Sequence, residues 1–116
     1  MQDDEFDFHS CIEIIRSKDA LTYEEGYLLL VDKASLYVDE LIALVKGEDD
    51  PYTRGKFVEL LGETRSPKAL SALAEELNHP DQNVRQWAVT GLNKLDLIEA
   101  DELVKGYEKS HPDEYA

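Results

Sequence analysis

The sequence predicts an all-α fold, an α-solenoid in which three helix pairs of similar sequence stack in tandem behind an N-terminal capping helix. One observation is a repeat period of about 31 residues, which is typical of helical solenoids. Two sets of identical, evenly spaced residues show it: Asp19, Asp50 and Asp81, and Leu30, Leu61 and Leu92. The other observation is that apolar residues recur at helical spacing within each copy. The 116 residues, 42% of them hydrophobic, suit one domain over residues 1–116 with a continuous core.

The segment 4–18 precedes the first repeat and is predicted to form an amphipathic capping helix. Its apolar residues Phe8, Cys11, Ile12 and Ile15 lie at helical spacing. A cap of this kind would cover the apolar side of the first repeat, which would otherwise face water. Cys11 is the single cysteine, so it cannot form an internal disulfide, and we expect it to act as a small buried hydrophobe in a reducing compartment.

Each repeat is predicted to contain two antiparallel helices. Pro51 and Pro67 are expected at helix starts, where proline is tolerated, with Ser66 as the N-cap before Pro67. Gly47 is expected to end a helix. The predicted helices are 22–33 and 36–46 in repeat one (about 19–47), 52–63 and 67–77 in repeat two (about 50–78), and 82–95 and 98–109 in repeat three (about 81–109).

The predicted second helices carry one apolar stripe at the same offset in every copy. The aligned sets are Val38, Ala69 and Ala100; Leu41, Ala72 and Leu103; and Ile42, Leu73 and Val104. The first helices carry a matching stripe that includes Leu30, Leu61 and Leu92. Since neither helix of a pair buries its stripe alone, stacking of the three pairs is expected to create the core.

Residues 81–85, Asp-Gln-Asn-Val-Arg, followed by Ala88 and Leu92, resemble the core motif of HEAT-like repeats, and residues 50–61 are a looser copy. The turn that contains Leu61-Gly62 and Ser66-Pro67-Lys68-Ala69-Leu70 is also similar to that family. The resemblance extends to short bacterial-type HEAT-repeat proteins and their phycobilin-lyase-like subtype. It implies a protein-interaction scaffold whose second helices line the concave face. It also implies that four charged residues bridge adjacent repeats: Asp50, Arg54, Asp81 and Arg85.

The chain carries a formal net charge of −14, and residues 1–50 hold 14 acidic and 4 basic side chains. Such a charge repels phosphate backbones and anionic lipid, so binding to nucleic acid or to a membrane is disfavoured. It favours association with a basic protein. The first residues are acidic rather than basic and apolar, and no uncharged stretch approaches membrane-spanning length, so we expect a cytoplasmic protein.

No group of residues predicts catalysis, a metal site or a bound cofactor, and the chain is not expected to be an enzyme. His9, Cys11 and Glu13 are close in sequence, but this spacing directs helical side chains to different faces. His79 and His111 each precede a proline, where a solvated turn residue is the usual role.

The predicted function is a non-catalytic protein-binding module, an acidic inhibitor, immunity protein or adaptor that occupies the surface of a basic protein. The residues expected to contact the partner are Asp39, Glu40, Glu75, Asp101, Glu102 and Trp87. For Trp87 the competing interpretation is that it covers the junction with the C-terminal helix. Two alternative functions stay open: a bilin-lyase-like activity, which the family resemblance implies, and a structural subunit of an oligomer.

Overall fold

The computed structural model describes residues 7–17 and 20–114, with the backbone alone for residues 20–23. This part of the chain contains α-helices and short 3₁₀ turns and no strand, which confirms the predicted all-α solenoid. The α-helices are α1 (Phe8–Arg16), α2 (Ala20–Val31), α3 (Val38–Gly47), α4 (Pro51–Glu63), α5 (Leu70–Glu76), α6 (Gln82–Lys94) and α7 (Ile98–Ser110). The 3₁₀ turns are η2 (Ala34–Tyr37), η3 (Pro67–Ala69) and η4 (Pro112–Glu114).

The repeated aspartates begin the first helices of repeats two and three. The carboxylate of Asp50 accepts a hydrogen bond from the Thr53 amide at 3.0 Å, and that of Asp81 accepts one from the Val84 amide at 3.1 Å. Each bond satisfies one of the amides that a helix start leaves without an intrahelical partner. The third aspartate of the series, Asp19, lies outside the described residues.

Two of the second helices begin later than predicted because a 3₁₀ turn precedes each of them, whereas α7 begins at Ile98 as predicted. In repeat one η2 covers residues 34–37 and α3 starts at Val38; in repeat two η3 covers residues 67–69 and α5 starts at Leu70. Ser66 does cap this segment, since its hydroxyl accepts a hydrogen bond from the Lys68 amide at 3.2 Å. A tight i to i+3 turn is a frequent start for a short α-helix.

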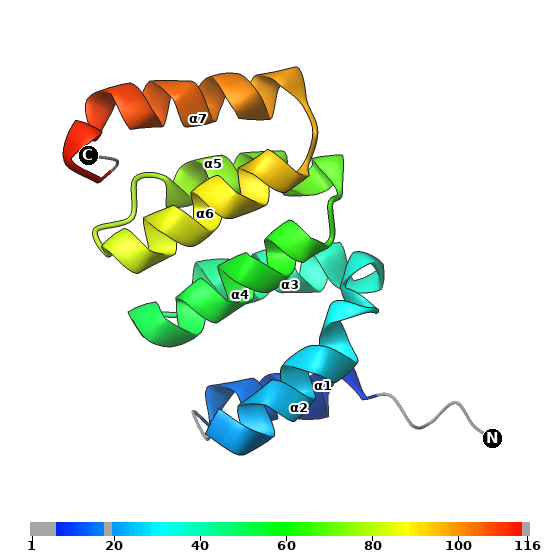
Figure 1. Ribbon diagram of the computed structural model, residues 1–116. Helices are drawn as coiled ribbons and strands as arrows, with labels where there is room; N and C mark the ends of the chain where they lie inside the picture. The colour runs from blue at the N-terminus through cyan, green and yellow to red at the C-terminus, as the bar shows by residue number, and fades with distance from the viewer. Residues whose placement is uncertain (1–6, 18–19, 115–116) are drawn as a thin grey trace.

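The helices stack in two layers along one direction (Figure 1). Helices α4 and α6 lie side by side in the front layer, with α3 and α5 behind them, and α7 closes the C-terminal end. The pair α1 and α2 lies at the opposite end. The resulting shape is elongated, with principal extents of 50, 27 and 22 Å.

Helices α4 and α6 pack closely together, and two glycines allow it. A Cβ built on Gly62 of α4 would lie 2.6 Å from the Cα of Gly91 in α6, and a Cβ on Gly91 would lie 3.2 Å from the Cα of Gly62. Any larger residue at Gly62 would push the two backbones apart. We call this pair the glycine contact.

Repeat one lacks this contact and packs differently. The positions one repeat period before Gly62 and Gly91 are Val31 and Leu60, so repeat one has no glycine pair at this register. Helix α2 packs chiefly on α1 instead, and α1 also contacts α4. The Arg16 guanidinium lies over the Phe57 ring, 5.3 Å from its centroid. The N-terminal segment is therefore an integral part of the stack, as expected of a cap.

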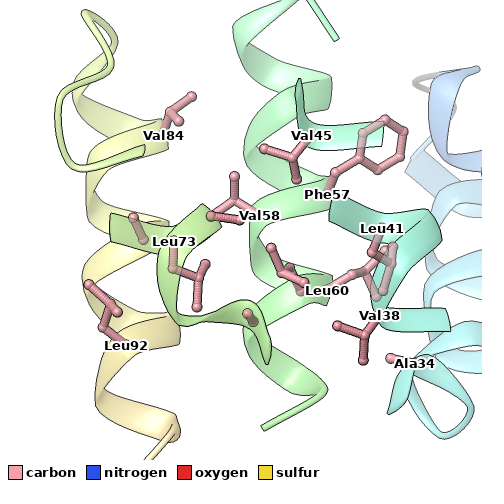
Figure 2. Close-up of a cluster of buried hydrophobic side chains, with 14 of the residues drawn as sticks. Ala34, Val38, Leu41, Val45, Phe57, Val58, Leu60, Leu73, Val84 and Leu92 are labelled. Carbon is pink, nitrogen blue, oxygen red and sulfur yellow. The ribbon is translucent and has the colours of Figure 1, made fainter. Parts of the chain in front are cut away.

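The core runs from Cys11 of α1 to Tyr107 of α7, and Figure 2 shows its middle part. Side chains from α3, such as Leu41 and Val45, meet Phe57 of α4, and the row continues to Leu73 of α5. The stripe Leu30, Leu61 and Leu92 is fully buried, as predicted. Two residues of the other predicted stripe are not buried: Ile42 of α3 is partly buried, and Leu103 of α7 is 39% exposed.

Candidate protein-binding site

Five carboxylates that the sequence singled out all lie exposed on the second helices. Asp39 and Glu40 are on α3, Glu75 is on α5, and Asp101 and Glu102 are on α7. We call these five residues the acidic face. Asp39 approaches Lys68 at 3.3 Å, but the side chains of Lys68 and Asp39 are 65% and 74% exposed. An ion pair so well solvated contributes little to stability, so both charges can be used for recognition.

A groove lies between α5 and α7. Its volume is about 310 Å³, and it is lined by Ala74, Leu77, Asn78, Glu102, Leu103, Gly106, Tyr107, Ser110 and His111. Leu103 lines this groove, and it is therefore partly exposed instead of buried like the equivalent residues Leu41 and Ala72. Glu102 belongs both to the groove and to the acidic face. An apolar depression next to solvated carboxylates suits a protein that presents an apolar and a basic group together.

Trp87 lies elsewhere, in a cleft between α4 and α6. The cleft has a volume of about 310 Å³ and is lined by Pro51, Tyr52, Gly55, Lys56, Asp81, Asn83 and Trp87. A Cβ on Gly55 would lie 3.3 Å from the Trp87 ring, so the indole packs on α4. The Lys56 ammonium lies 5.9 Å from the Trp87 ring centroid and 5.2 Å from that of Tyr52. The structure thus places Trp87 with the first helices and not with the acidic face on the second helices.

A comparison with protein families matches residues 38–116 to the family described as HEAT repeats. The chain belongs to the HEAT-repeat family. HEAT repeats generally mediate protein–protein interaction, so a binding module is the function class that the family supports. A comparison with curated proteins gave no match. Within residues 7–17 and 20–114, no helix is long and apolar enough to cross a membrane.

The two repeated arginines of these HEAT repeats occupy equivalent positions and play equivalent roles. Arg54 donates to the Glu48 carbonyl at 3.0 Å, in the link before α4, and makes two hydrogen bonds to the Glu76 carboxylate at 2.7 and 2.8 Å. The Glu76 side chain is only 3% exposed. Arg54 therefore joins the link between repeats one and two to the last turn of α5. The pKa of Arg54 is raised, chiefly by its hydrogen bonds to Glu76.

Arg85 repeats this arrangement one period later. It donates to the His79 carbonyl at 2.9 Å and to the Tyr107 hydroxyl at 2.8 Å. Tyr107 follows Arg85 at the same separation in sequence as Glu76 follows Arg54. Because a tyrosine replaces the glutamate, the negative charge comes from Glu114 in η4, whose carboxylate lies 2.7 Å from Arg85. Hydrogen bonds from Tyr107 and Arg85 hold the pKa of Glu114 below its usual value.

The links before these arginines are also equivalent. Glu48 and His79 occupy the same position of successive repeats, and each accepts a hydrogen bond at 3.0 Å from the amide of the aspartate that caps the next helix. Glu48 additionally pairs with Arg16 of α1 at 2.7 Å. The family positions Asp50, Arg54, Asp81 and Arg85 are thus occupied by structural contacts that fix how successive repeats join.

The residues near the N-terminus do not converge on a metal. Cys11 is buried, and burial raises the pKa of its thiol, whereas His9 is exposed and approaches Glu13 at 4.0 Å. In the described part of the chain, no three His, Cys, Asp or Glu side chains gather closely enough to hold a metal ion.

Sequence reasoning singled out the five carboxylates of the acidic face, whose role in binding stays a prediction, but it did not predict the α5–α7 groove. It assigned Leu103 to the buried stripe because the equivalent residues Leu41 and Ala72 are apolar, and both of these are indeed buried. The available signal was Gly106, a glycine in the interior of a predicted helix, where glycine lowers helix stability unless packing or function requires it.

Proposed function

We propose that this HEAT-repeat protein is a non-catalytic binding module, an inhibitor, immunity protein or adaptor, that occupies the surface of a basic protein partner. The observation that carries the proposal is the placement of the acidic face. All five of its carboxylates are exposed on α3, α5 and α7, and the overall charge of −14 adds a long-range attraction for a basic surface.

The exposure of these carboxylates favours recognition over chemistry. General acid–base catalysis requires a carboxyl group that is partly removed from water or paired with a second titrating group. Exposed carboxylates instead contribute to binding when a partner covers them, and they increase the association rate at low ionic strength. We therefore propose that the partner is held by charge complementarity, with Trp87 in the α4–α6 cleft as a separate contact.

The test is affinity capture of a basic protein from the native lysate at low salt. The variant carries Asp39→Lys, Glu40→Lys and Asp101→Lys. A matched control carries three reversals at exposed positions of the N-terminal region: Glu24→Lys, Glu25→Lys and Asp32→Lys. We expect the wild-type protein and the control to recover the same basic protein, the variant to lose it, and raised salt to weaken the complex.

Two results would contradict the acidic-face mechanism. One is equal recovery of the partner by the wild type and by the Asp39, Glu40 and Asp101 variant, provided that circular dichroism shows the variant to be folded. The other is that no basic protein is recovered at all. In the second case a bilin ligand, which the family resemblance suggested, would be tested by adding phycobilin and recording its absorption spectrum.

A structural role in an oligomer is the second candidate, because apolar side chains are exposed near the N-terminal end. Leu28 and Leu29 of α2 are more than half exposed, and so is Leu36 of η2. Sedimentation of the purified protein over a range of concentrations tests this candidate. A dimer that Leu28→Ser and Leu29→Ser dissociate would favour it, whereas a monomer at all concentrations would exclude it.

A further inference from the structure

Six glycines occur in the described part of the chain, and Gly106 alone among them lies in the interior of a helix without a packing reason. Close neighbours explain Gly26, Gly55, Gly62 and Gly91, since an added Cβ at each would lie within 3.3 Å of another atom. Gly47 ends α3. Gly106 lies within α7, and a Cβ added there would meet nothing within 4 Å. A glycine inside a helix costs about 0.5–1 kcal/mol relative to alanine.

A role in the groove between α5 and α7 would account for this loss of helix stability, because Gly106 forms part of the groove lining. Gly106 lines the same groove as Ala74, Leu77 and Leu103, so a large side chain at this position would occupy part of that space. The small residue therefore leaves the groove open and its apolar lining accessible to a partner. Leu103 is the large apolar residue of this lining that is exposed to solvent, at 39%.

The charges on the two helices that border the groove indicate what kind of partner segment it would accept. The helices α5 and α7 expose five carboxylates, those of Glu75, Glu99, Asp101, Glu102 and Glu108. Against these they expose two lysines, Lys105 and Lys109. Of these charged residues, Glu102 lines the groove itself. The excess of negative charge on the two helices, together with the apolar lining of the groove, complements an apolar side chain with lysine or arginine close to it.

From these observations we propose that the α5–α7 groove receives a large apolar side chain of the partner, presented by a basic amphipathic segment. The proposal rests on the proposed function and extends it: the acidic face attracts the segment, and the groove fixes its register by burying one apolar anchor. Such anchors contribute most of the affinity at many interfaces, while the surrounding charges adjust rate and specificity.

A synthetic helical peptide with leucines on one face and lysines on the other is the probe. Its binding to the whole chain is followed by fluorescence anisotropy and by amide chemical shifts. The groove is filled by Gly106→Leu, and the matched control is Gly47→Leu, since a Cβ at either glycine meets no atom within 4 Å. We expect Gly106→Leu to weaken binding about tenfold or more and Gly47→Leu to leave it unchanged.

A second peptide, in which serine replaces leucine at unchanged charge, separates the two proposals. If the groove inference holds, the serine peptide binds the wild type about as weakly as the leucine peptide binds Gly106→Leu. If both peptides bind the wild type and Gly106→Leu equally, the groove inference is wrong. If charge reversal at Asp101 and Glu102 then abolishes that binding, the proposal that the acidic face binds a basic partner is still supported. If the leucine peptide does not bind the wild type at all, the groove inference is also overturned.

Discussion

At the scale of single residues, the partly buried charged side chains act in structure and the exposed ones are available for recognition. Asp50 and Asp81 cap helices, and Arg54 and Arg85 each tie an inter-repeat link to a second helix. These roles require the same residue in successive copies, which is why the repeat preserves them. Asp39 and Glu40 of repeat one occupy the same positions as Asp101 and Glu102 of repeat three, whereas repeat two has Leu70 and Ser71 there. All five residues of the acidic face are exposed.

The buried pair between Arg54 and Glu76 gives the first prediction. Glu76→Leu should lower the free energy of unfolding by about 3 kcal/mol, because it leaves the Arg54 guanidinium, itself only 18% exposed, without its carboxylate. Replacing both partners, Arg54→Met with Glu76→Leu, should be less destabilising than Glu76→Leu alone, since no unpaired charge stays behind. Urea denaturation measures both values. A double variant less stable than the single variant would contradict this account.

The pH dependence of the Arg85, Tyr107 and Glu114 cluster gives the second prediction. The pKa of Glu114 is lower in the folded than in the unfolded chain, so the carboxylate stabilises the fold above the ordinary glutamate pKa of about 4.3. That stabilisation is lost as the pH falls through the lowered folded-state pKa. We expect the stability difference between the wild type and Glu114→Gln to be constant from pH 7 to about pH 5 and to disappear at lower pH.

Denaturation curves at each pH value test the Glu114 prediction. Asp113→Asn is the charge-matched control, because Asp113 is exposed on the same 3₁₀ turn. If Glu114→Gln and Asp113→Asn showed the same pH profile, the effect would come from net charge and not from the hydrogen bonds that Tyr107 and Arg85 make to Glu114.

At the scale of helices, the contact between α4 and α6 depends on the absence of side chains at two positions. The first helices of repeats two and three meet at Gly62 and Gly91, whereas those of repeats one and two have Val31 and Leu60 at the same register. The sequence repeat is therefore regular, but the packing that it produces is not. Helix α2 packs chiefly on α1 rather than on α4.

Substitution of these glycines gives the third prediction. Gly62→Ala should be the more damaging change, by about 1–3 kcal/mol, because its Cβ would lie 2.6 Å from the backbone of Gly91. Gly91→Ala should cost less, since its nearest contacts are at 3.2 Å and include the flexible end of Leu73. Gly106→Ala should raise stability by about 0.5–1 kcal/mol. Thermal or urea denaturation ranks the three variants, and any other order would contradict the assigned packing.

At the scale of the whole molecule, the sequence was sufficient to predict the fold because the repeat period and the helical spacing of apolar residues are both local signals. The sequence also predicted where α4 and α6 start, because Asp50 and Asp81 are recognisable N-cap residues. It was not sufficient for the position of Trp87 or for the exposure of Leu103, because these depend on which helices meet in space. Nor could it show that Glu114 would supply the charge that Tyr107 lacks.

The uneven packing along the stack gives the fourth prediction. Amide hydrogen exchange should be slowest in α4 and α6, which share the glycine contact and a buried core, and faster in α2, whose Leu28 and Leu29 are exposed. Hydrogen exchange followed by mass spectrometry resolves these helices. Equal protection of α2 and α6 would show that the three repeats unfold as one cooperative unit.

The glycine contact also has a mechanical consequence. When the ends of the protein are pulled apart, force passes along the stack from one layer to the next. The boundary between α2 and α4, which has Val31 and Leu60 in place of the two glycines, should yield at a lower force than the boundary between α4 and α6, whose backbones meet at Gly62 and Gly91. The molecule would then extend in two stages, first by releasing α1 and α2 and only later by separating the repeats that carry the α5–α7 groove. A partner held at that groove would stay bound through the first of these stages.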